Sequence, residues 1–424
     1  MTSSDKVSIR YGEVETELAV IPATDGHSGI DVSKLIATTG LSSYDQGFVN
    51  TASTKSAITF IDGDKGILRH RGYPIEQLAE RKSYLDVAYL LIHGELPTAT
   101  QFAEFDHSIR KHTLVHENVV KFFDTFQATA HPMAILSSAV SVLSTFYNDS
   151  QDPRDIDQVE LSTIRLLAKL PVLTAYTHKT LVGHAKIYPD NNFSLVQNFL
   201  KMTFGNPAEE YIQNPVITKA LDTLLLLHAD HEQNCSTSTV RMVGSSHATL
   251  FASISSGINA LSGPLHGGAN EAVLDMLRFI QKSGDSVQKY VERVKNKEDG
   301  IKLMGFGHRV YKSFDPRAKI VKSHADQVLK ELGVNDPLLD IAKELEAAAL
   351  ADDYFVERKL YPNVDFYTGV IYKAMGFPPK MFTPLFAIGR LPGWIAHWRE
   401  QNSDSTTRIG RPQQIYTGHT ERSI

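Results

Sequence analysis

The sequence is almost without cysteine, since Cys235 is the only one among 424 residues. A single thiol excludes an intramolecular disulfide and a zinc site built from several thiolates. No apolar run approaches the ~18 residues of a membrane span. The first twenty residues carry four acidic side chains and have neither the apolar core of a signal peptide nor the basic character of a transit peptide. We therefore expect a cytoplasmic protein without a membrane segment.

Excess positive charge is also missing. The net charge of −5 at pH 7 argues against non-specific binding to nucleic acid or to anionic membranes. An anionic ligand would therefore need a local cluster of arginines. The composition, 42% hydrophobic and 21% charged, is that of an ordinary globular protein. A chain of this length is expected to form about two to three domains and to bury its core without covalent staples.

The N-terminal part differs from the rest in its periodicity. Short segments of alternating polarity, separated in pairs by turns that contain glycine, predict two pairs of strands. They lie at residues 7–10 and 15–21, and at 58–61 and 66–69. We expect a small β-rich N-terminal region over residues 1–65.

From about Pro74 the pattern becomes helical. Ser83 and Asp86 form a capping-box start to an amphipathic segment, and Gly94 stands where a helix would end. Three pairs of a capping residue and a proline predict further helix starts: Asn214-Pro215, Asp336-Pro337 and Thr383-Pro384. Small residues fill positions 252–260, which indicates either a crowded core helix or a close subunit contact, and the sequence leaves both open. The fold class is mainly α.

Two histidines stand between glycines: His266 within Gly263–Gly268, and His308 after Gly305-Phe306-Gly307. Glycine allows close backbone approach to a ligand, and histidine suits proton transfer near neutral pH. The alternative to a ligand-binding role for His266 is that its glycines only build a turn between two helices, with Asn270 capping a helix over residues 271–282.

Three more segments are candidates for chemistry. If residues 227–232 are helical, His228 and His231 share one face. This spacing is not a zinc-protease motif, and the alternative is a pair of buried histidines satisfied by Asp230 and Glu232. Lys312 and Arg317 suit an acyl carrier with phosphates and a carboxylate substrate, although no Walker loop is present.

The last of these segments contains Asp365, for which two interpretations compete. On spacing alone it fits the N-cap of a helix over residues 366–375. Only the combination with the histidines makes it a candidate general base.

Together these segments resemble the citrate synthase family. The run Gly305–Arg317 matches the signature of that family throughout, and segments 227–277, 363–369, 386–390 and 411–412 extend the likeness over nearly the whole chain. The β-rich start is similar to the longer bacterial type (type II-like). The resemblance implies a two-domain helical fold, with a large domain over residues 66–270 and 380–424 and a small domain over residues 271–379.

The resemblance also implies roles for individual residues. Asp365 would remove a methyl proton from acetyl-CoA, His266 would stabilise the enolate, and His308 would protonate the oxaloacetate carbonyl. Carboxylate-binding residues would be His231, Arg317, Arg390 and Arg411. Contacts to CoA would come from Leu303, Gly305, Phe306, Lys312, Arg358 and Lys359.

By the same resemblance, water hydrolyses citryl-CoA, and no metal or other cofactor is expected. Arg411 would act across a subunit interface, which implies a homodimer at minimum, and the sequence does not distinguish a dimer from a hexamer. Closure of the two domains would exclude water during condensation. No nucleic-acid or membrane partner is expected.

Some positions depart from related enzymes. Asp190 and Ala208 stand where enzymes inhibited by NADH carry a basic residue and a reactive cysteine, so we expect weak NADH inhibition or none. Cys235 is expected to be a buried structural thiol. The nearest alternative activity is that of a 2-methylcitrate synthase using propionyl-CoA, followed by a citryl-CoA lyase-like protein and a non-catalytic binding protein of the same fold.

Overall fold

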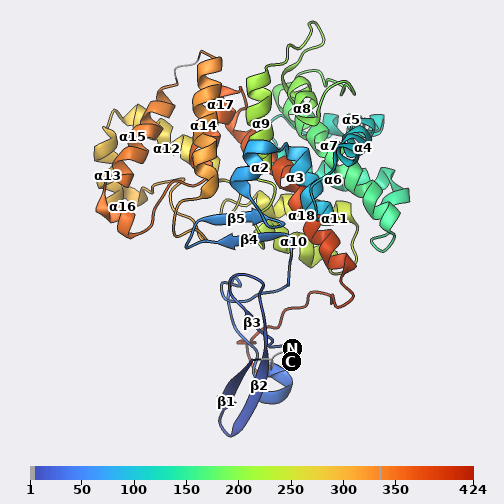
Figure 1. Ribbon diagram of the computed structural model, residues 1–424, viewed down its shortest axis with the longest axis vertical. Coiled ribbons are helices and arrows are strands. Elements are labelled where there is room, and N and C mark those ends of the chain that lie inside the picture. Colours follow the sequence, from blue (N-terminus) through green and yellow to red (C-terminus); the bar gives the residue numbers. More distant parts are fainter. Residues whose placement is uncertain (1–4, 334–335) are drawn as a thin grey trace. The chain divides into compact units, whose positions relative to one another are not determined.

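The computed structural model describes residues 5–333 and 336–424 and is mainly helical (Figure 1). The chain forms two compact units. One consists of Met1–Ala57 together with Ile409–Ile424, and the other is Ile58–Arg408.

The first unit contains a small antiparallel sheet in the order β1-β2-β3, made of Lys6–Tyr11, Val14–Ile21 and Gly29–Ile30. Lys6 pairs with Ala19 and Tyr11 with Val14, so a tight turn joins the first two strands, as the sequence predicts. A short helix, α1 (Leu35–Thr39), follows and ends at a glycine.

The second unit begins with another antiparallel sheet, in the order β4-β5-β6. Its strands are Thr59–Asp62, Ile67–His70 and Tyr73–Pro74. Thr59 pairs with His70 and Asp62 with Ile67, which confirms the second predicted strand pair. These strands belong to the same compact unit as the helices that follow.

Helices make up most of the second unit. The first group is α2 (Ile75–Arg81), α3 (Tyr84–His93), α4 (Ala99–Lys111), α5 (Glu117–Phe122), α6 (Pro132–Leu143), α7 (Ile156–Val182), α8 (Leu195–Phe204), α9 (Pro215–Leu227), α10 (Cys235–Gly244) and α11 (Leu250–Leu261). The second is α12 (Ala269–Ser283), α13 (Val287–Lys295), α14 (Pro316–Glu331), α15 (Pro337–Leu350), α16 (Asp353–Glu357), α17 (Asp365–Ala374) and α18 (Phe382–Ser403). Short 3-10 turns lie at residues 123–125, 144–146, 148–150, 298–300 and 379–381.

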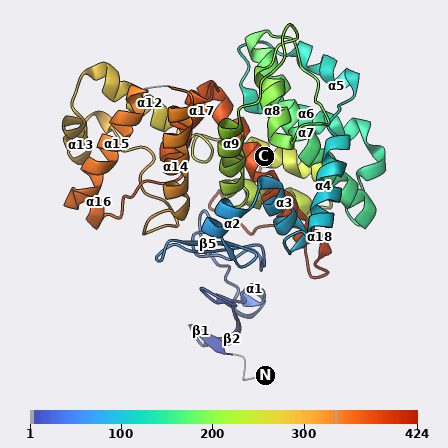
Figure 2. The same ribbon diagram turned by 45° about the horizontal axis from the view of Figure 1, so that its top comes forward.

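The core is organised around α18, which packs against α3, α7, α9, α10 and α11. This helix is buried along most of its length, including Trp394 and Trp398. No helix in residues 5–333 or 336–424 combines the length and apolarity needed to cross a membrane. Around α15, helices α12, α13, α16 and α17 form a second packed group (Figure 2).

Most of the predicted helix starts are confirmed. Ser83 and Asp86 form a capping box for α3, and Gly94 ends that helix in a left-handed conformation. Asn214 and Asp336 cap α9 and α15. The prediction for Thr383-Pro384 is wrong, because α18 already begins at Phe382 and the Thr383 hydroxyl donates to a distant carbonyl.

The small residues of α11 allow a crowded core. A Cβ at Gly257 would come within 2.6 Å of Val240 Cγ2 on α10, and the buried Ser255 hydroxyl donates to the Ser137 carbonyl of α6 at 2.9 Å. The crowded-core interpretation is confirmed for these positions. The alternative of a subunit contact stays a prediction.

Candidate active site

His266 lies in the turn between α11 and α12. Gly267 makes this turn possible, because a Cβ there would approach the Leu261 carbonyl oxygen to 2.3 Å. The predicted cap by Asn270 is wrong, since α12 begins at Ala269 and Asn270 is buried inside the helix. The Asn270 side chain accepts from the neighbouring Glu271 N–H at 2.9 Å.

The hydrogen bonds of His266 favour one tautomer of its ring. The Ser236 backbone N–H donates to Nε2 at 3.3 Å, and the Ser236 hydroxyl lies 2.9 Å from the same nitrogen. A backbone N–H can only donate, so this contact favours an accepting Nε2 with the ring proton on Nδ1, while the Ser236 hydroxyl also donates to Oδ1 of Asn234 at 2.7 Å. Burial, reinforced by Arg390, lowers the pKa of His266 to about 4. The ring is therefore neutral at pH 7 and can donate a hydrogen bond from Nδ1.

The hydrogen bonds of His308 place the ring proton on the other nitrogen. The N–H groups of Val310 and Tyr311 both point at Nδ1, at 3.0 and 3.3 Å. The proton of the neutral ring is therefore on Nε2. Burial and the nearby Arg317 lower the pKa of His308 to about 4. The two glycine-flanked histidines thus present opposite ring nitrogens as donors.

Asp365 is not a helix cap. It is the first residue of α17, whose capping position is Val364, and its side chain makes no capping hydrogen bond. Instead the Asn363 side chain accepts from the Asp365 N–H at 3.0 Å. The same amide group donates to the Gly307 carbonyl at 2.9 Å, and the Asn363 N–H donates to the Gly305 carbonyl at 2.9 Å. Asn363 thereby ties the glycine loop of His308 to Asp365.

The ionised form of the Asp365 carboxyl group is disfavoured in the folded protein. Burial raises its pKa to about 6, the charge of Arg317 opposes this rise, and Asp315 adds to it. The side chain itself is only half-buried, so it stays accessible to a small ligand. A carboxylate with a pKa near neutrality is suited to removing a proton from carbon.

His231 is not on a helix with His228. Helix α9 ends at Leu227, so the two rings do not share a helical face and that prediction is wrong. Nor do the neighbouring acids satisfy them: Asp230 bonds to His397 at 3.3 Å, and Glu232 accepts from the Ile61 N–H.

The ring of His231 meets the His308 loop. Its Nε2 lies 3.2 Å from the Tyr311 hydroxyl, and its centroid lies 5.2 Å from that of the His308 ring. Burial, with Arg317 next, lowers the pKa of His231 well below its usual value. Sequence reasoning missed Tyr311, which has an exposed fraction of 1% and links two predicted substrate-binding segments.

Two buried arginines accompany these histidines. The Arg317 guanidinium makes a two-point contact with the Asp315 carboxylate, at 3.0 and 2.9 Å. Although burial alone would lower it, this carboxylate raises the pKa of Arg317 above its ordinary value. The Arg390 Nε donates to the His228 carbonyl at 2.7 Å, and burial lowers the pKa of Arg390 to about 10.

Several buried polar atoms near these arginines have no hydrogen-bond partner among the described residues. They include Nε2 of His70, Nε2 of His228 and Oδ1 of Asp230. Arg317 and Arg390 act electrostatically on both histidines. Unpaired buried polar groups are costly, so their gathering here marks a polar region, in which the two buried guanidinium groups favour an anionic ligand. In the described part of the chain, no group of three or more His, Cys, Asp and Glu side chains could hold a metal ion.

The predicted CoA residues fall into two groups. Gly305 and Phe306 are buried, Leu303 is half-buried, and the Phe306 ring packs on Phe366 beside Asp365, with centroids 4.7 Å apart. Three cations are exposed: Lys312, Arg358 and Lys359.

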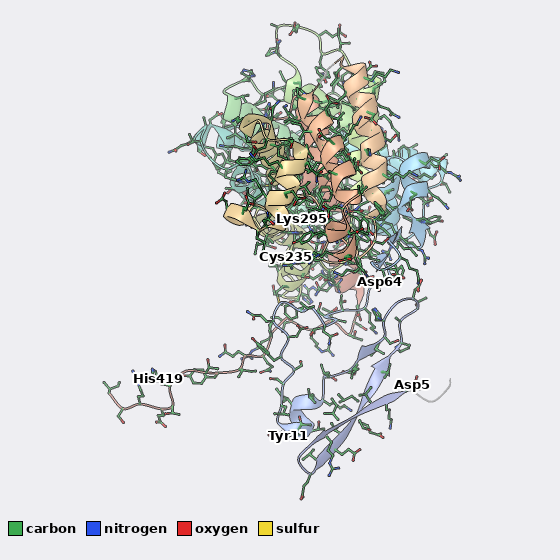
Figure 3. All side chains as sticks on the ribbon, turned by 90° about the vertical axis from the view of Figure 1, so that its left-hand side faces the viewer. Asp5, Tyr11, Asp64, Cys235, Lys295 and His419 are labelled. Carbon is green, nitrogen blue, oxygen red and sulfur yellow. The ribbon has the colours of Figure 1, made fainter. Side chains whose placement is uncertain are left out.

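Arg411 and Cys235 complete the predicted set. Arg411 is exposed and belongs to the unit formed by residues 1–57 and 409–424, so its contact with the site stays a prediction. The expectation of a buried Cys235 is wrong: it is the exposed first residue of α10 (Figure 3). Asn234 caps α10. Ser236, which follows Cys235, is buried and donates from its hydroxyl to Oδ1 of Asn234.

Comparison with known proteins gives a consistent result. The family model "Citrate synthase, C-terminal domain" matches residues 47–413. Citrate synthase 1 of Mycobacterium tuberculosis is 62% identical over 420 residues, covering 99% of this chain and 97% of the relative.

Solved structures show the same likeness. The citrate synthase of Pyrobaculum aerophilum superposes with a TM-score of 0.83 at 33% identity, over 98% of each chain. A ternary complex of carboxymethyl coenzyme A and oxaloacetate with the enzyme of Thermoplasma acidophilum has a TM-score of 0.80 at 27% identity, over 90% of this chain and 98% of that one.

Proposed function

The chain belongs to the citrate synthase family, and we propose that His266, His308 and Asp365 carry its condensation of acetyl-CoA with oxaloacetate. The enzyme then hydrolyses citryl-CoA to citrate and CoA, the entry step of the tricarboxylic acid cycle. The relatives establish the activity, and the geometry of the side chains supports the division of labour among the three residues.

The first step is removal of a proton from the methyl group of acetyl-CoA. Asp365 is the base, because burial raises its pKa to about 6 while leaving most of it ionised at pH 7. His266 donates its Nδ1–H to the thioester oxygen as negative charge develops there. A fixed neutral donor in a site with little water stabilises such an enolate without reorganising.

The second step is attack of the enolate carbon on the oxaloacetate carbonyl. His308 donates from Nε2 to the carbonyl oxygen and gives up its proton as the carbon–carbon bond forms. The two backbone N–H groups at its Nδ1 hold the ring in this tautomer. Because the pKa of the ring is lowered to about 4, His308 is neutral at pH 7 and acts as a neutral donor to the oxygen on which negative charge develops.

The carboxylates of oxaloacetate are bound by His231, Arg317 and Arg390. The buried positions of the three side chains and the positive charge of the two arginines support this assignment. The resemblance adds Arg411 from a neighbouring subunit, so the proposed enzyme is at least a homodimer. Its CoA phosphates would meet Lys312, Arg358 and Lys359, and closure of a large and a small domain would exclude water.

The single observation that carries the proposal is the pair of histidines whose backbone N–H contacts favour opposite tautomers. The test is release of free thiol from acetyl-CoA in the presence of oxaloacetate, with citrate identified by mass. His266→Ala and His308→Ala should each lower kcat by about 100-fold or more, because each removes one donor to developing charge.

Propionyl-CoA serves as the competing substrate in the same assay. An extra methylene changes binding by only ~1–3 kcal/mol, so some turnover is expected, with acetyl-CoA preferred in kcat/KM. A preference for propionyl-CoA would contradict the proposed substrate, and full activity of either histidine variant would contradict the proposed roles.

A further inference from the structure

The turn between β4 and β5, residues 62–66, lies next to catalytic residues that are far from it in the sequence. The Asp62 carboxylate accepts from the N–H groups of Asp64 and Lys65 at 3.1 and 3.0 Å, and pairs with the Lys65 ammonium at 2.9 Å. The turn is therefore held rigid by its own side chains.

One side of this turn touches the His308 loop, defined as residues 308–314. The Lys312 N–H donates to the Gly63 carbonyl at 2.8 Å. A Cβ at Gly63 would lie 2.0 Å from the Val310 carbonyl oxygen, and a Cβ at Gly66 would lie 2.7 Å from the Phe314 carbonyl oxygen. The two backbones thus meet directly, which only glycine permits at position 63. In Figure 1 the tip of the hairpin lies beside the segment that leads into α14.

The other side is fixed to the segment that contains His231. The Ile61 N–H, at the end of β4, donates to Oε1 of Glu232 at 3.2 Å. Glu232 directly follows His231 and has a left-handed backbone, with φ of 50°. Such a conformation is uncommon for a residue other than glycine and needs support from its surroundings.

These contacts converge on the substrate-binding geometry. His308 is oriented by the N–H groups of Val310 and Tyr311, and Val310 is the residue that lies against Gly63. His231 meets the Tyr311 hydroxyl at 3.2 Å. Moving the loop away from the turn would therefore displace His308 and Tyr311 together, relative to His231.

We propose that Gly63 is a positioning residue: the β4–β5 turn, anchored to the His231 segment through Ile61 and Glu232, sets the distance between His231 and His308 that oxaloacetate needs. This inference rests on the proposed roles of the two histidines. It assigns the turn to the oxaloacetate side of the reaction, because its contacts reach His308 and His231, whereas His266 is held by Ser236.

The main test is Gly63→Ala with Gly29→Ala as its control. An ordinary contact begins near 3.4 Å, so the new methyl group would push the loop away by more than 1 Å. A misplacement of this size costs roughly 100-fold in rate. A methyl group at Gly29 meets no atom within 4 Å, and that residue has no left-handed backbone. Steady-state kinetics with each substrate varied in turn, on proteins shown to be folded by circular dichroism, provide the readout.

The expected result falls mainly on one substrate. Gly63→Ala should lower kcat and raise KM for oxaloacetate clearly more than KM for acetyl-CoA, which changes less although Lys312, a proposed CoA contact, lies on the same loop. Gly29→Ala should behave as the wild type. If Gly63→Ala matches Gly29→Ala, or if it raises both KM values equally, the positioning role is refuted. An inactive wild type would instead refute the proposed function itself.

A second pair of variants applies if Gly63→Ala does not fold. Asp62→Ala adds no atom and removes the acceptors that stiffen the turn, so it should cause the same oxaloacetate-specific loss, roughly fivefold. Glu232→Ala should act alike, and Glu232→Gln, whose amide oxygen can still accept from Ile61, should retain more activity than Glu232→Ala. Unchanged oxaloacetate kinetics in Asp62→Ala and Glu232→Ala would refute the inference.

Discussion

Replacing Asp365 by asparagine should make the protein more stable while inactivating it. Burial raises the pKa of this carboxyl from 3.8 to about 6, so ionisation is opposed in the folded state. One pKa unit corresponds to 1.36 kcal/mol, and a rise of about two units therefore costs at most about 3 kcal/mol once the group is ionised. Asparagine has nearly the same shape and carries no charge, so it avoids this cost.

The pH dependence follows from the direction of the shift. Below pH 3.8 the carboxyl is protonated in both folded and unfolded states, and it contributes no penalty. The penalty grows as pH rises from 3.8 to about 6, and it is constant above that. The gain of Asp365→Asn over the wild type should therefore be largest at pH 8, about 3 kcal/mol, and about half of that at pH 5.

Thermal unfolding without substrates, followed by circular dichroism at both pH values, is the assay. A gain of this size corresponds to a rise of several degrees in Tm at pH 8. The matched control is Asp353→Asn, because Asp353 is also the first residue of a helix but is exposed. It should show no gain. A variant at position 365 that is no more stable than the wild type, or equally stabilised at pH 5 and pH 8, would refute the reasoning.

Three further outcomes are expected. The wild-type kcat/KM for acetyl-CoA should fall about tenfold from pH 7 to pH 5, because Asp365 must be ionised to act as a base; a flat profile would contradict this. Arg317→Ala should lower the free energy of unfolding in urea by about 3–5 kcal/mol, because it leaves Asp315 buried without its partner, and the double change with Asp315→Asn should recover part of that loss. NADH should inhibit weakly or not at all, because Asp190 is acidic where a dinucleotide phosphate would need a basic partner, and it already occupies Lys201 at 3.1 Å; micromolar inhibition competitive with acetyl-CoA would overturn this.

Local patterns predicted the local structure well. The two strand pairs and the starts of α3, α9 and α15 were readable, because turns, capping residues and prolines act within a few positions of the chain. The helix starts predicted at Asn270 and Thr383 were wrong, because neither side chain caps a helix. Asn270 is buried inside α12, and the Thr383 hydroxyl donates to the Gly267 carbonyl.

The site itself was only partly predictable. Composition and spacing singled out the glycine-flanked histidines, but spacing alone favoured a helix cap at Asp365, whereas in the structure its N–H donates to the Asn363 side chain and Val364 holds the capping position. The partners that favour this tautomer of His266 and fix the position of His231 are Ser236 and Tyr311, 30 and 80 residues away. No local pattern in the sequence predicts such pairings, because the tertiary fold creates them.

The central claim is that Asp365 removes the methyl proton of acetyl-CoA, and its most direct test is the kcat of Asp365→Asn, measured by release of free thiol with both substrates saturating. Loss of a general base predicts a fall of about 10²–10⁴-fold in a folded protein that still binds oxaloacetate. A variant that keeps kcat within tenfold of the wild type would contradict the account.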